Sequence, residues 1–145
     1  MTKAQTTLLV LLRISLGAFF LYAGLSQLFD PSWSPQGFLL GAKSFPGLYA
    51  FFASPMMLPI IAFVNKWALT LLGISLIVGS CVRLSSLLGA VLMLLYYGAQ
   101  LSFPYVGGSF LVDQHVIYIF ALLFISAIDA GQWWGFDGFL RKRTR

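Results

Sequence analysis

The residues of this chain that could do chemistry are few, and most of them stand near the ends of long apolar segments. The single histidine, His115, can donate a hydrogen bond or relay a proton near neutral pH. Lys66 and Asp113 could tune its charge or pair with each other. We predict that these residues form one ligand-binding site with amides and phenols at a similar depth. The predicted site residues are Gln27, Lys66, Tyr96, Gln100, Asp113, His115 and Tyr118.

The segment 29–59 is expected to cover this site. It is rich in proline and in aromatic residues, so it is too interrupted to cross a membrane and suits an interfacial loop with short helices. Aromatic walls with a few hydrogen-bond donors suit a flat, amphipathic ligand, and a quinone is the cofactor we expect. The alternative is that His115 is a hydrogen-bonded interface residue, and that the polar rim is only where the helices meet water.

Other kinds of site find no support in the sequence. One histidine and one cysteine, Cys81, give no metal-ligand spacing, no haem ligated by two histidines of the chain and no dithiol pair. Cys81 is expected to be a small packing residue. No phosphate loop, nucleophile elbow, paired-carboxylate or flavin motif is evident. Electrons for a redox reaction would therefore come from a partner protein or directly from a substrate.

The composition indicates an integral membrane protein in contact with the lipid bilayer. Of the 145 residues, 59% are hydrophobic and only 9% are charged, whereas soluble domains carry about 25% charged residues. The net charge of +5 does not indicate nucleic-acid binding, because four of the nine basic residues stand in the terminal RKRTR cluster. Such a cluster beside a membrane helix contacts anionic lipid and sets topology.

Four apolar segments predict an all-α fold, an integral membrane four-helix bundle that forms one domain over residues 1–145. The expected spans are residues 6–28, 60–82, 84–101 and 111–128, with an outer loop at 29–59 and a basic cytoplasmic tail at 132–145. Arg83 is expected to be the hinge between the second and third spans, which must then be antiparallel neighbours.

The basic residues predict that both termini lie in the cytoplasm. Lys3, Arg13, Arg83 and the tail fall on one side of the predicted spans, and only Lys43 and Lys66 fall on the other. An excess of lysine and arginine marks the cytoplasmic side of a membrane protein.

Polar and small residues recur on each span at a spacing of three or four, so they share one face and should point into the bundle. Gly17, Gly24 and Gly73 lie in the middles of the spans, where they allow close approach of helix backbones. Nearer the cytoplasm, Arg13 is predicted to form a structural ion pair with Asp129, because an unpaired guanidinium costs about 2.5–3.5 kcal/mol in the membrane. The alternative is that Arg13 reaches the headgroups.

Several stretches share their order and spacing with one known family. The first span carries RISLGAFFLYAGLSQLF (residues 13–29), and the second and third carry WALTLLGISLIVG followed by VRLSSLLGA. His115 and a W-G-x-D ending (Trp134, Gly135 and Asp137) follow in order. Together these motifs resemble the DoxX family of small four-helix membrane proteins over nearly the whole chain.

The resemblance implies a protein of the bacterial or archaeal cytoplasmic (inner) membrane that is linked to redox systems. Relatives include the DoxD-type subunit of thiosulfate:quinone oxidoreductase and DoxX proteins associated with oxidative-stress complexes. Relatives often have lysine where this chain has Gln27, and Lys66 could supply that charge instead.

Two functions are therefore expected from different classes. The first is a quinone-binding subunit of a thiol or sulfur oxidoreductase with a redox partner protein, in which His115 would be the candidate proton relay. The second is a non-catalytic membrane scaffold or assembly partner, which could also form a homo-oligomer. A small-molecule carrier is disfavoured, because four helices leave little room for a gated path and the chain has no internal repeat.

Overall fold

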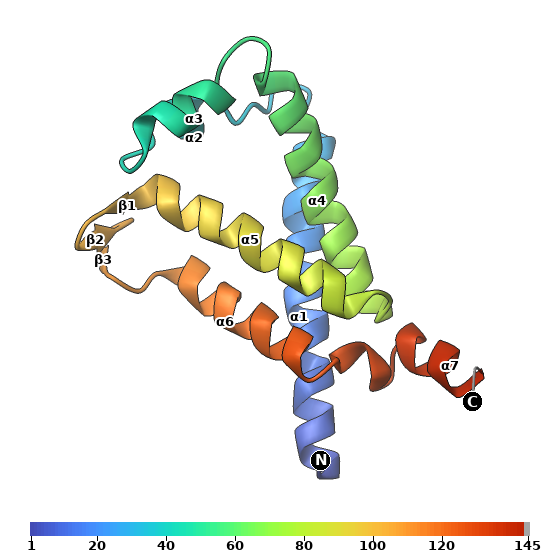
Figure 1. The fold of residues 1–145 in the computed structure, drawn as a ribbon. Coiled ribbons are helices and arrows are strands. Elements are labelled where there is room, and N and C mark those ends of the chain that lie inside the picture. The colour runs from blue at the N-terminus through green and yellow to red at the C-terminus, as the bar shows by residue number, and fades with distance from the viewer. Residues whose placement is uncertain (144–145) are drawn as a thin grey trace.

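The computed structural model describes residues 1–143, and long apolar helices dominate it (Figure 1). Three helices are long and apolar enough to cross a membrane: α1 (Lys3–Leu28), α4 (Leu58–Val78) and α5 (Val82–Gln100). The next helix, α6 (Gln114–Ala127), is apolar but has only 14 residues. The mostly helical membrane class is thus confirmed, whereas a fourth membrane span stays a prediction.

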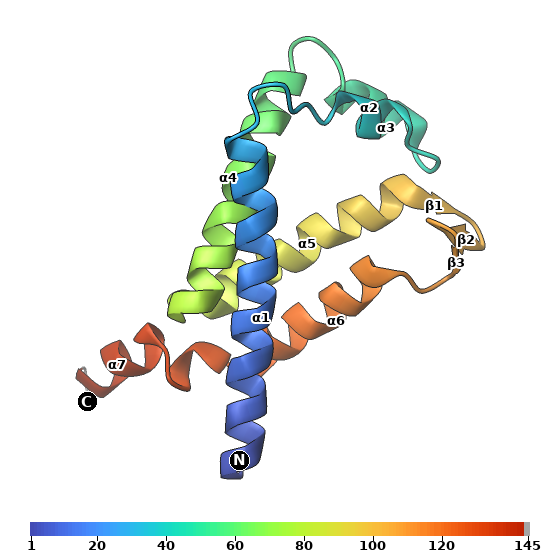
Figure 2. The same ribbon diagram turned by 180° about the vertical axis from the view of Figure 1, so that it is seen from behind.

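The long helices form two pairs that cross, α1 with α4 and α5 with α6. Both ribbon views show α4 and α5 close together at their shared turn and diverging from it as a wedge (Figures 1 and 2). Two short helices, α2 (Gln36–Leu40) and α3 (Pro46–Phe52), lie across the open end of the wedge. The N-terminus, the α4–α5 turn and α7 (Phe136–Arg143) lie at the other end.

The helices of the first pair pack through glycines, as the sequence predicted. A Cβ atom at Gly17 would lie 3.0 Å from the carbonyl oxygen of Gly73, and one at Gly24 would lie 2.5 Å from the backbone nitrogen of Thr70. Real Cβ atoms do not approach backbone so closely, so the α1–α4 distance depends on these small residues. The core beside this contact is formed by Phe20, Leu69, Leu72, Leu76, Leu122 and Ile125.

The turn between α4 and α5 lies at residues 79–81, and the prediction of a hinge at Arg83 is wrong. Gly79 ends α4 with a φ of 75°, a left-handed conformation that glycine adopts without steric cost. The Asp137 carboxylate accepts hydrogen bonds from the backbone N–H groups of Cys81 (2.8 Å) and Val82 (3.1 Å). These groups begin α5, so the cap places Arg83 inside the helix. Cys81 is exposed, not packed in the interior as expected.

The connection between α5 and α6 is a small antiparallel sheet within the otherwise helical fold. Its strands are β1 (Leu101–Ser102), β2 (Tyr105–Val106) and β3 (Ser109–Phe110), in that order. Gly107 and Gly108, both with positive φ, supply the tight turn between the last two strands.

Arg13 is almost fully buried, with 1% of its surface exposed. Its Nη1 donates hydrogen bonds to the carbonyl oxygens of Ala130 (2.8 Å) and Trp133 (3.0 Å), and its Nη2 donates to that of Trp134 (3.3 Å). These main-chain partners stand in place of the predicted Asp129 carboxylate. The reason is local, because Asp129 ends α6 with a φ of 53° and the turn that follows brings carbonyl groups to the guanidinium.

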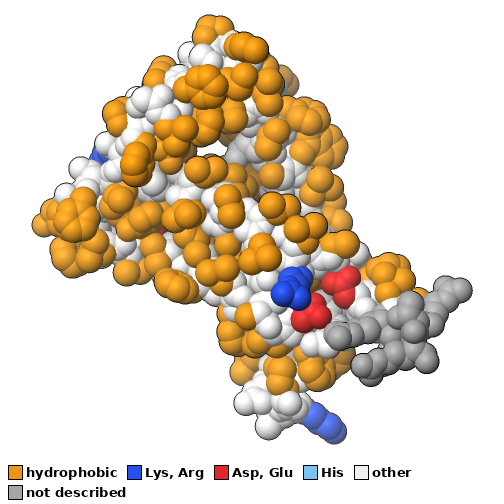
Figure 3. Space-filling model, viewed as in Figure 1, with side chains coloured by type: hydrophobic (Ala, Val, Ile, Leu, Met, Phe, Trp, Pro, Cys, Tyr) orange, Lys and Arg blue, Asp and Glu red, His pale blue; other side chains and the backbone are white. Residues whose placement is uncertain are grey.

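Hydrophobic side chains cover most of the face seen in Figure 3, and charged side chains gather near α7 and the N-terminus. Exposed leucine, isoleucine and phenylalanine side chains are frequent along α1, α4, α5 and α6. Soluble monomers rarely expose contiguous apolar patches of this kind. The basic tail predicted for residues 132–145 falls partly on α7, and residues 144–145 lie outside the described part of the chain.

Candidate functional site

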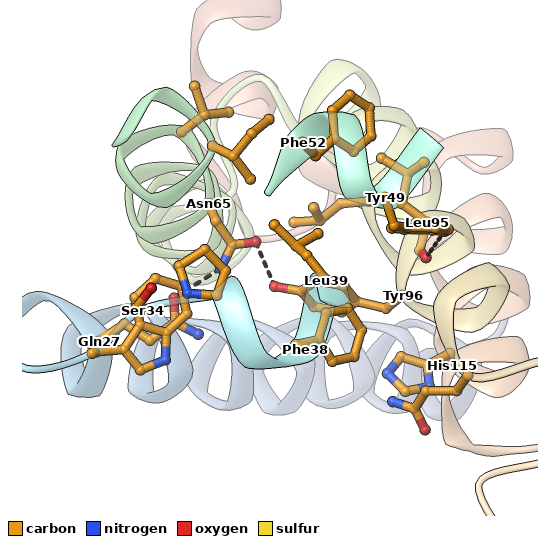
Figure 4. Close-up of a pocket in the computed structure, with 16 residues that line it drawn as sticks. Gln27, Ser34, Phe38, Leu39, Tyr49, Phe52, Asn65, Leu95, Tyr96 and His115 are labelled. Atoms are coloured by element: carbon orange, nitrogen blue, oxygen red, sulfur yellow. Dashed lines mark hydrogen bonds between the residues drawn. The ribbon is translucent and has the colours of Figure 1, made fainter. Parts of the chain in front are cut away.

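A cavity of about 420 Å³ lies where the α2–α3 segment covers the open end of the α4–α5 wedge. Figure 3 shows the molecule hollowed between these elements, and Figure 4 shows side chains converging on the space from several helices. Most of the wall is apolar, and a few polar side chains stand in it. The lining is formed by Gln27, Trp33, Ser34, Pro35, Phe38, Leu39, Tyr49, Phe52, Ile61, Val64, Asn65, Leu92, Leu95, Tyr96, Gln100 and His115.

A chain of hydrogen bonds joins three of the polar side chains in the cavity wall. The Nδ2 of Asn65 donates to the Oε1 of Gln27 at 2.9 Å, and the hydroxyl of Tyr96 donates to the Oδ1 of Asn65 (Figure 4). These residues come from α4, α1 and α5, so the chain links the two crossed helix pairs. Side chains held by such bonds present their remaining polar atoms in fixed positions, which is what a selective pocket needs.

His115 is held in place by Asp113, the residue that caps α6. The Oδ1 of Asp113 accepts from the backbone N–H of His115 at 3.0 Å, and its Oδ2 lies 2.5 Å from the imidazole Nδ1. A carboxylate accepts hydrogen bonds, so this contact assigns a proton to Nδ1 and leaves the Nε2 lone pair available. No hydrogen bond to Nε2 is found among residues 1–143. The carboxylate therefore fixes the orientation of the imidazole and leaves Nε2 without a protein partner in the described part of the chain.

One aromatic ring packs against the imidazole, and a second ring packs against the first. The ring of Tyr96 packs edge-on against it, with 5.8 Å between centroids and an interplanar angle of 82°. The ring of Phe38, from α2, packs edge-on against the other side of Tyr96 at 5.5 Å. A planar ligand would thus meet ring edges and faces next to a titratable nitrogen.

The cover is attached to α5 by hydrogen bonds. The hydroxyl of Tyr49 donates to the carbonyl oxygen of Leu95 at 2.6 Å, and the hydroxyl of Ser44 donates to that of Leu101 at 2.6 Å. Burial raises the pKa of the Tyr49 phenol, so it keeps the proton that it donates. The segment therefore covers the cavity, as its aromatic composition predicted.

The predicted site residues divide into two groups. Gln27, Tyr96, Gln100 and His115 line the cavity. Lys66, Asp113 and Tyr118 do not line it. Lys66 places its Nζ 5.1 Å from the centroid of the Trp33 ring, which does line the cavity. Asp113 supports His115, and Lys66 and Asp113 do not pair with each other.

Tyr118 is half-buried and packs against the core of the molecule. Its ring lies 5.0 Å from that of Phe19 and 5.9 Å from that of Phe20. On α6 it lies three residues after His115, and the structure turns it toward α1, away from the cavity. The prediction that Tyr118 faces the ligand together with His115 is therefore not supported by the cavity lining.

Several lining residues were missing from the predicted set. Asn65 joins Gln27 to Tyr96; the sequence predicted it in the same polar layer but not among the ligand-binding residues. Trp33, Phe38 and Tyr49 were expected only as part of an aromatic cover. No group of three His, Cys, Asp or Glu side chains able to hold a metal ion is found within residues 1–143.

Comparison with known proteins gives one result. A family model described as DoxX matches residues 8–100, from the first turns of α1 to the end of α5. The matched part includes Gln27, Asn65 and Tyr96, and His115 lies beyond it. Neither the curated proteins nor the solved structures give a significant match.

Proposed function

The chain belongs to the DoxX family, a membrane family associated with redox systems, and from this premise we propose that it binds a quinone or a similar amphipathic ring compound. It would do so as a membrane subunit of a thiol or sulfur oxidoreductase system. The observation that carries the proposal is the cavity itself, in which an oriented imidazole stands beside aromatic rings and a fixed amide. A quinone ring has two carbonyl oxygens that an amide N–H or a protonated imidazole can bind, and a planar face for such walls.

The residues present fit a quinone head group. The cavity of about 420 Å³ falls within the range of small-molecule sites, which hold about 300–1,000 Å³. The polar atoms near its wall belong to Gln27, Asn65, Tyr96, Gln100 and His115. When bound, the quinone would supply the two-electron acceptor that the chain's own side chains lack.

His115 would handle protons at this site. When His115 is neutral, its Nε2 lone pair can take a proton from a hydroxyl group of the bound ligand. The Oδ2 of Asp113, 2.5 Å from Nδ1, would stabilise the resulting imidazolium. When His115 is protonated, Nε2 donates a hydrogen bond to a carbonyl oxygen. The hydroxyl of Tyr96 is already engaged by Asn65, so this pair positions groups and leaves proton transfer to His115.

The proposed placement in the membrane puts this cavity at the outer side of a bacterial or archaeal cytoplasmic membrane. Lys3, the α4–α5 turn with Arg83 and the basic α7 share one end of the molecule, which the positive-inside rule assigns to the cytoplasm (Figure 1). We propose α6 as the fourth crossing. Its 14 residues rise only about 21 Å, so the apolar residues on either side of it would complete the span.

The proposal is tested by quinone binding to protein in lipid nanodiscs. A short-tailed benzoquinone is titrated against the wild type and two variants, and the dissociation constants are compared. His115→Ala should weaken binding by about tenfold, because it removes a hydrogen bond worth about 1.5 kcal/mol. Tyr118→Phe is the matched control on the same helix, and it should bind like the wild type. Unchanged affinity in His115→Ala would remove His115 from the site, and no saturable binding by the wild type would refute the proposal.

The second candidate function is a membrane scaffold without chemistry. The observation that favours it is the exposed aromatic surface of the small sheet, where Phe103 is 80% exposed, Tyr105 60% and Phe110 65%. A redox partner protein or a second copy of the chain could dock there. The test is a pull-down with the wild type, His115→Ala and the double variant Phe103→Ser, Phe110→Ser. A stoichiometric partner that binds the first two proteins but not the double variant would favour this function over quinone binding.

A further inference from the structure

A second cavity, of about 440 Å³, lies between α4 and α5 on the side toward their shared turn. Its wall is mostly aliphatic, with serines and Cys81 toward the turn, and we call it the α4–α5 groove. The groove is lined by Ala68, Leu71, Leu72, Ile74, Ser75, Ser80, Cys81, Leu84, Ser85, Leu88, Gly89 and Leu92. The proposed function makes no use of it.

The groove continues the quinone cavity along both helices. On α4, the cavity residues 61, 64 and 65 are followed by groove residues 68, 71, 72 and 75, which recur at three- and four-residue spacing on one face. On α5, groove residues 84, 85, 88 and 89 lead in the same way to cavity residues 95 and 96. Leu92 lines both spaces. The two spaces therefore lie end to end along the inside of the wedge and adjoin at Leu92.

The groove is open on the lipid-facing side of the helices. Leu71 is 57% exposed and Leu88 62% exposed, although both line it. Its far end is closed by hydroxyl groups, where Ser75 Oγ lies 2.6 Å from Ser85 Oγ and donates to the carbonyl oxygen of Ser80. A hydrocarbon chain could lie in the aliphatic part and end before this polar cluster. The distance along α5 from Leu92 to Leu84 is about 12 Å, the length of an extended decyl chain.

We propose that the α4–α5 groove binds the hydrophobic tail of the ligand whose head group lies in the cavity beside His115. This inference rests on the proposed function, and it names the substrate class more narrowly as a ring compound with a long apolar tail. The ligand would enter sideways from the bilayer through the open edge of the wedge. Continuity through Leu92 selects this occupant over an independent lipid, because a tail in the groove leads directly to the polar side chains of the cavity.

The test compares two probes that share a head group. They are a dimethoxy-methyl-benzoquinone without a tail and the same ring with a decyl chain, each titrated against protein in nanodiscs. Leu88→Trp fills the groove, and Leu87→Trp places the same ring on α5 at a residue that does not line it. Comparing variants with the same probe cancels the partition of the decyl compound into lipid.

Leu88→Trp should weaken binding of the decyl compound by about tenfold, or about 1.4 kcal/mol, and leave the tail-less compound unchanged. Ala68→Phe, on the opposite wall, should have the same selective effect, and Leu87→Trp should affect neither probe. Melting temperatures equal to that of the wild type confirm folding of each variant.

Each other outcome overturns the inference in a recognisable way. If the tail-less compound binds and the decyl compound is insensitive to both groove variants, the groove holds a bilayer lipid or nothing, and the proposed function survives alone. If both probes weaken equally, the substitutions act on the head-group cavity and no tail site exists. If neither probe binds the wild type, the proposed function and this inference fail together.

Discussion

Replacing Asp137 by alanine should destabilise the protein by removing the cap of α5. The carboxylate accepts hydrogen bonds from the backbone N–H groups of Cys81 at 2.8 Å and Val82 at 3.1 Å, although it lies more than fifty residues away in sequence. The backbone N–H of Asp137 donates in turn to the carbonyl oxygen of Gly79 at 2.9 Å. The segment after α6 is thereby joined to the turn between α4 and α5.

The magnitude follows from the surroundings of each hydrogen bond. The bond to Val82 is partly buried, and a hydrogen bond to a charged group contributes about 1.5–3 kcal/mol. The bond to Cys81 is exposed, so water can replace it in the variant. Its loss should therefore lower the free energy of unfolding by about 0.5 kcal/mol, near the low end of the range for helix caps. We expect a loss of about 2–3 kcal/mol, which corresponds to a fall of about 6–9 °C in melting temperature for a chain of this size.

The assay is thermal unfolding in one detergent, followed by circular dichroism, with two comparison variants. Asp137→Asn keeps one acceptor oxygen and should fall between the wild type and Asp137→Ala. Asp30→Ala removes the same charge from an exposed turn, where the carboxylate accepts from the backbone N–H and the hydroxyl of Ser32, and should lower the melting temperature by about 2 °C or less. Equal melting temperatures for Asp137→Ala and Asp30→Ala would refute the capping role of Asp137.

Three further predictions concern packing and charge. Arg13→Met should destabilise more than Arg13→Lys in the same unfolding assay, because methionine leaves three carbonyl oxygens without a donor and lysine can still serve some of them. Gly73→Ala should cost about 1–3 kcal/mol, because the new Cβ would meet the backbone of α1, whereas Gly47→Ala has open space and should be nearly neutral. Ser32→Ala should raise the pKa of Asp30, which hydrogen bonds from Ser32 lower, in a carboxyl NMR titration. The stability contributed by that contact is present above the unfolded-state pKa of Asp30 and is lost as pH falls through its lower folded-state pKa.

The sequence predicted the long helices well, because uncharged apolar runs leave little choice of structure. The expected spans 6–28 and 60–82 correspond to α1 and α4 within a few residues, apart from the end at the turn. The predicted position of that turn was wrong because Arg83 is the most conspicuous polar residue of the segment. The turn is in fact formed by Gly79 and by the carboxylate of Asp137, which is distant in sequence. A glycine after an apolar helix is a recognised end signal, so part of this information was present locally.

The site was predicted in part, for a related reason. Gln27, Tyr96 and His115 were identified because polar groups in apolar helices are costly and must face one another. The crossing of the two helix pairs could not be predicted from spacing on single helices, since it depends on packing between them. For that reason Tyr118 was predicted to be a site residue, although it packs against the core and does not line the cavity. The α4–α5 groove was not predicted, because its aliphatic residues look like those of any membrane-spanning helix.

The most direct test of ligand binding in this cavity is photoaffinity labelling with a benzoquinone that carries a photoreactive group on its ring. Protein in nanodiscs is irradiated with the probe, digested and mapped by mass spectrometry. We predict that adducts fall on the segments that line the cavity, residues 33–39 and 92–100, and that excess unlabelled quinone removes them. Adducts spread over the exposed lipid-facing residues of all helices, and unaffected by the competitor, would contradict a quinone site beside His115.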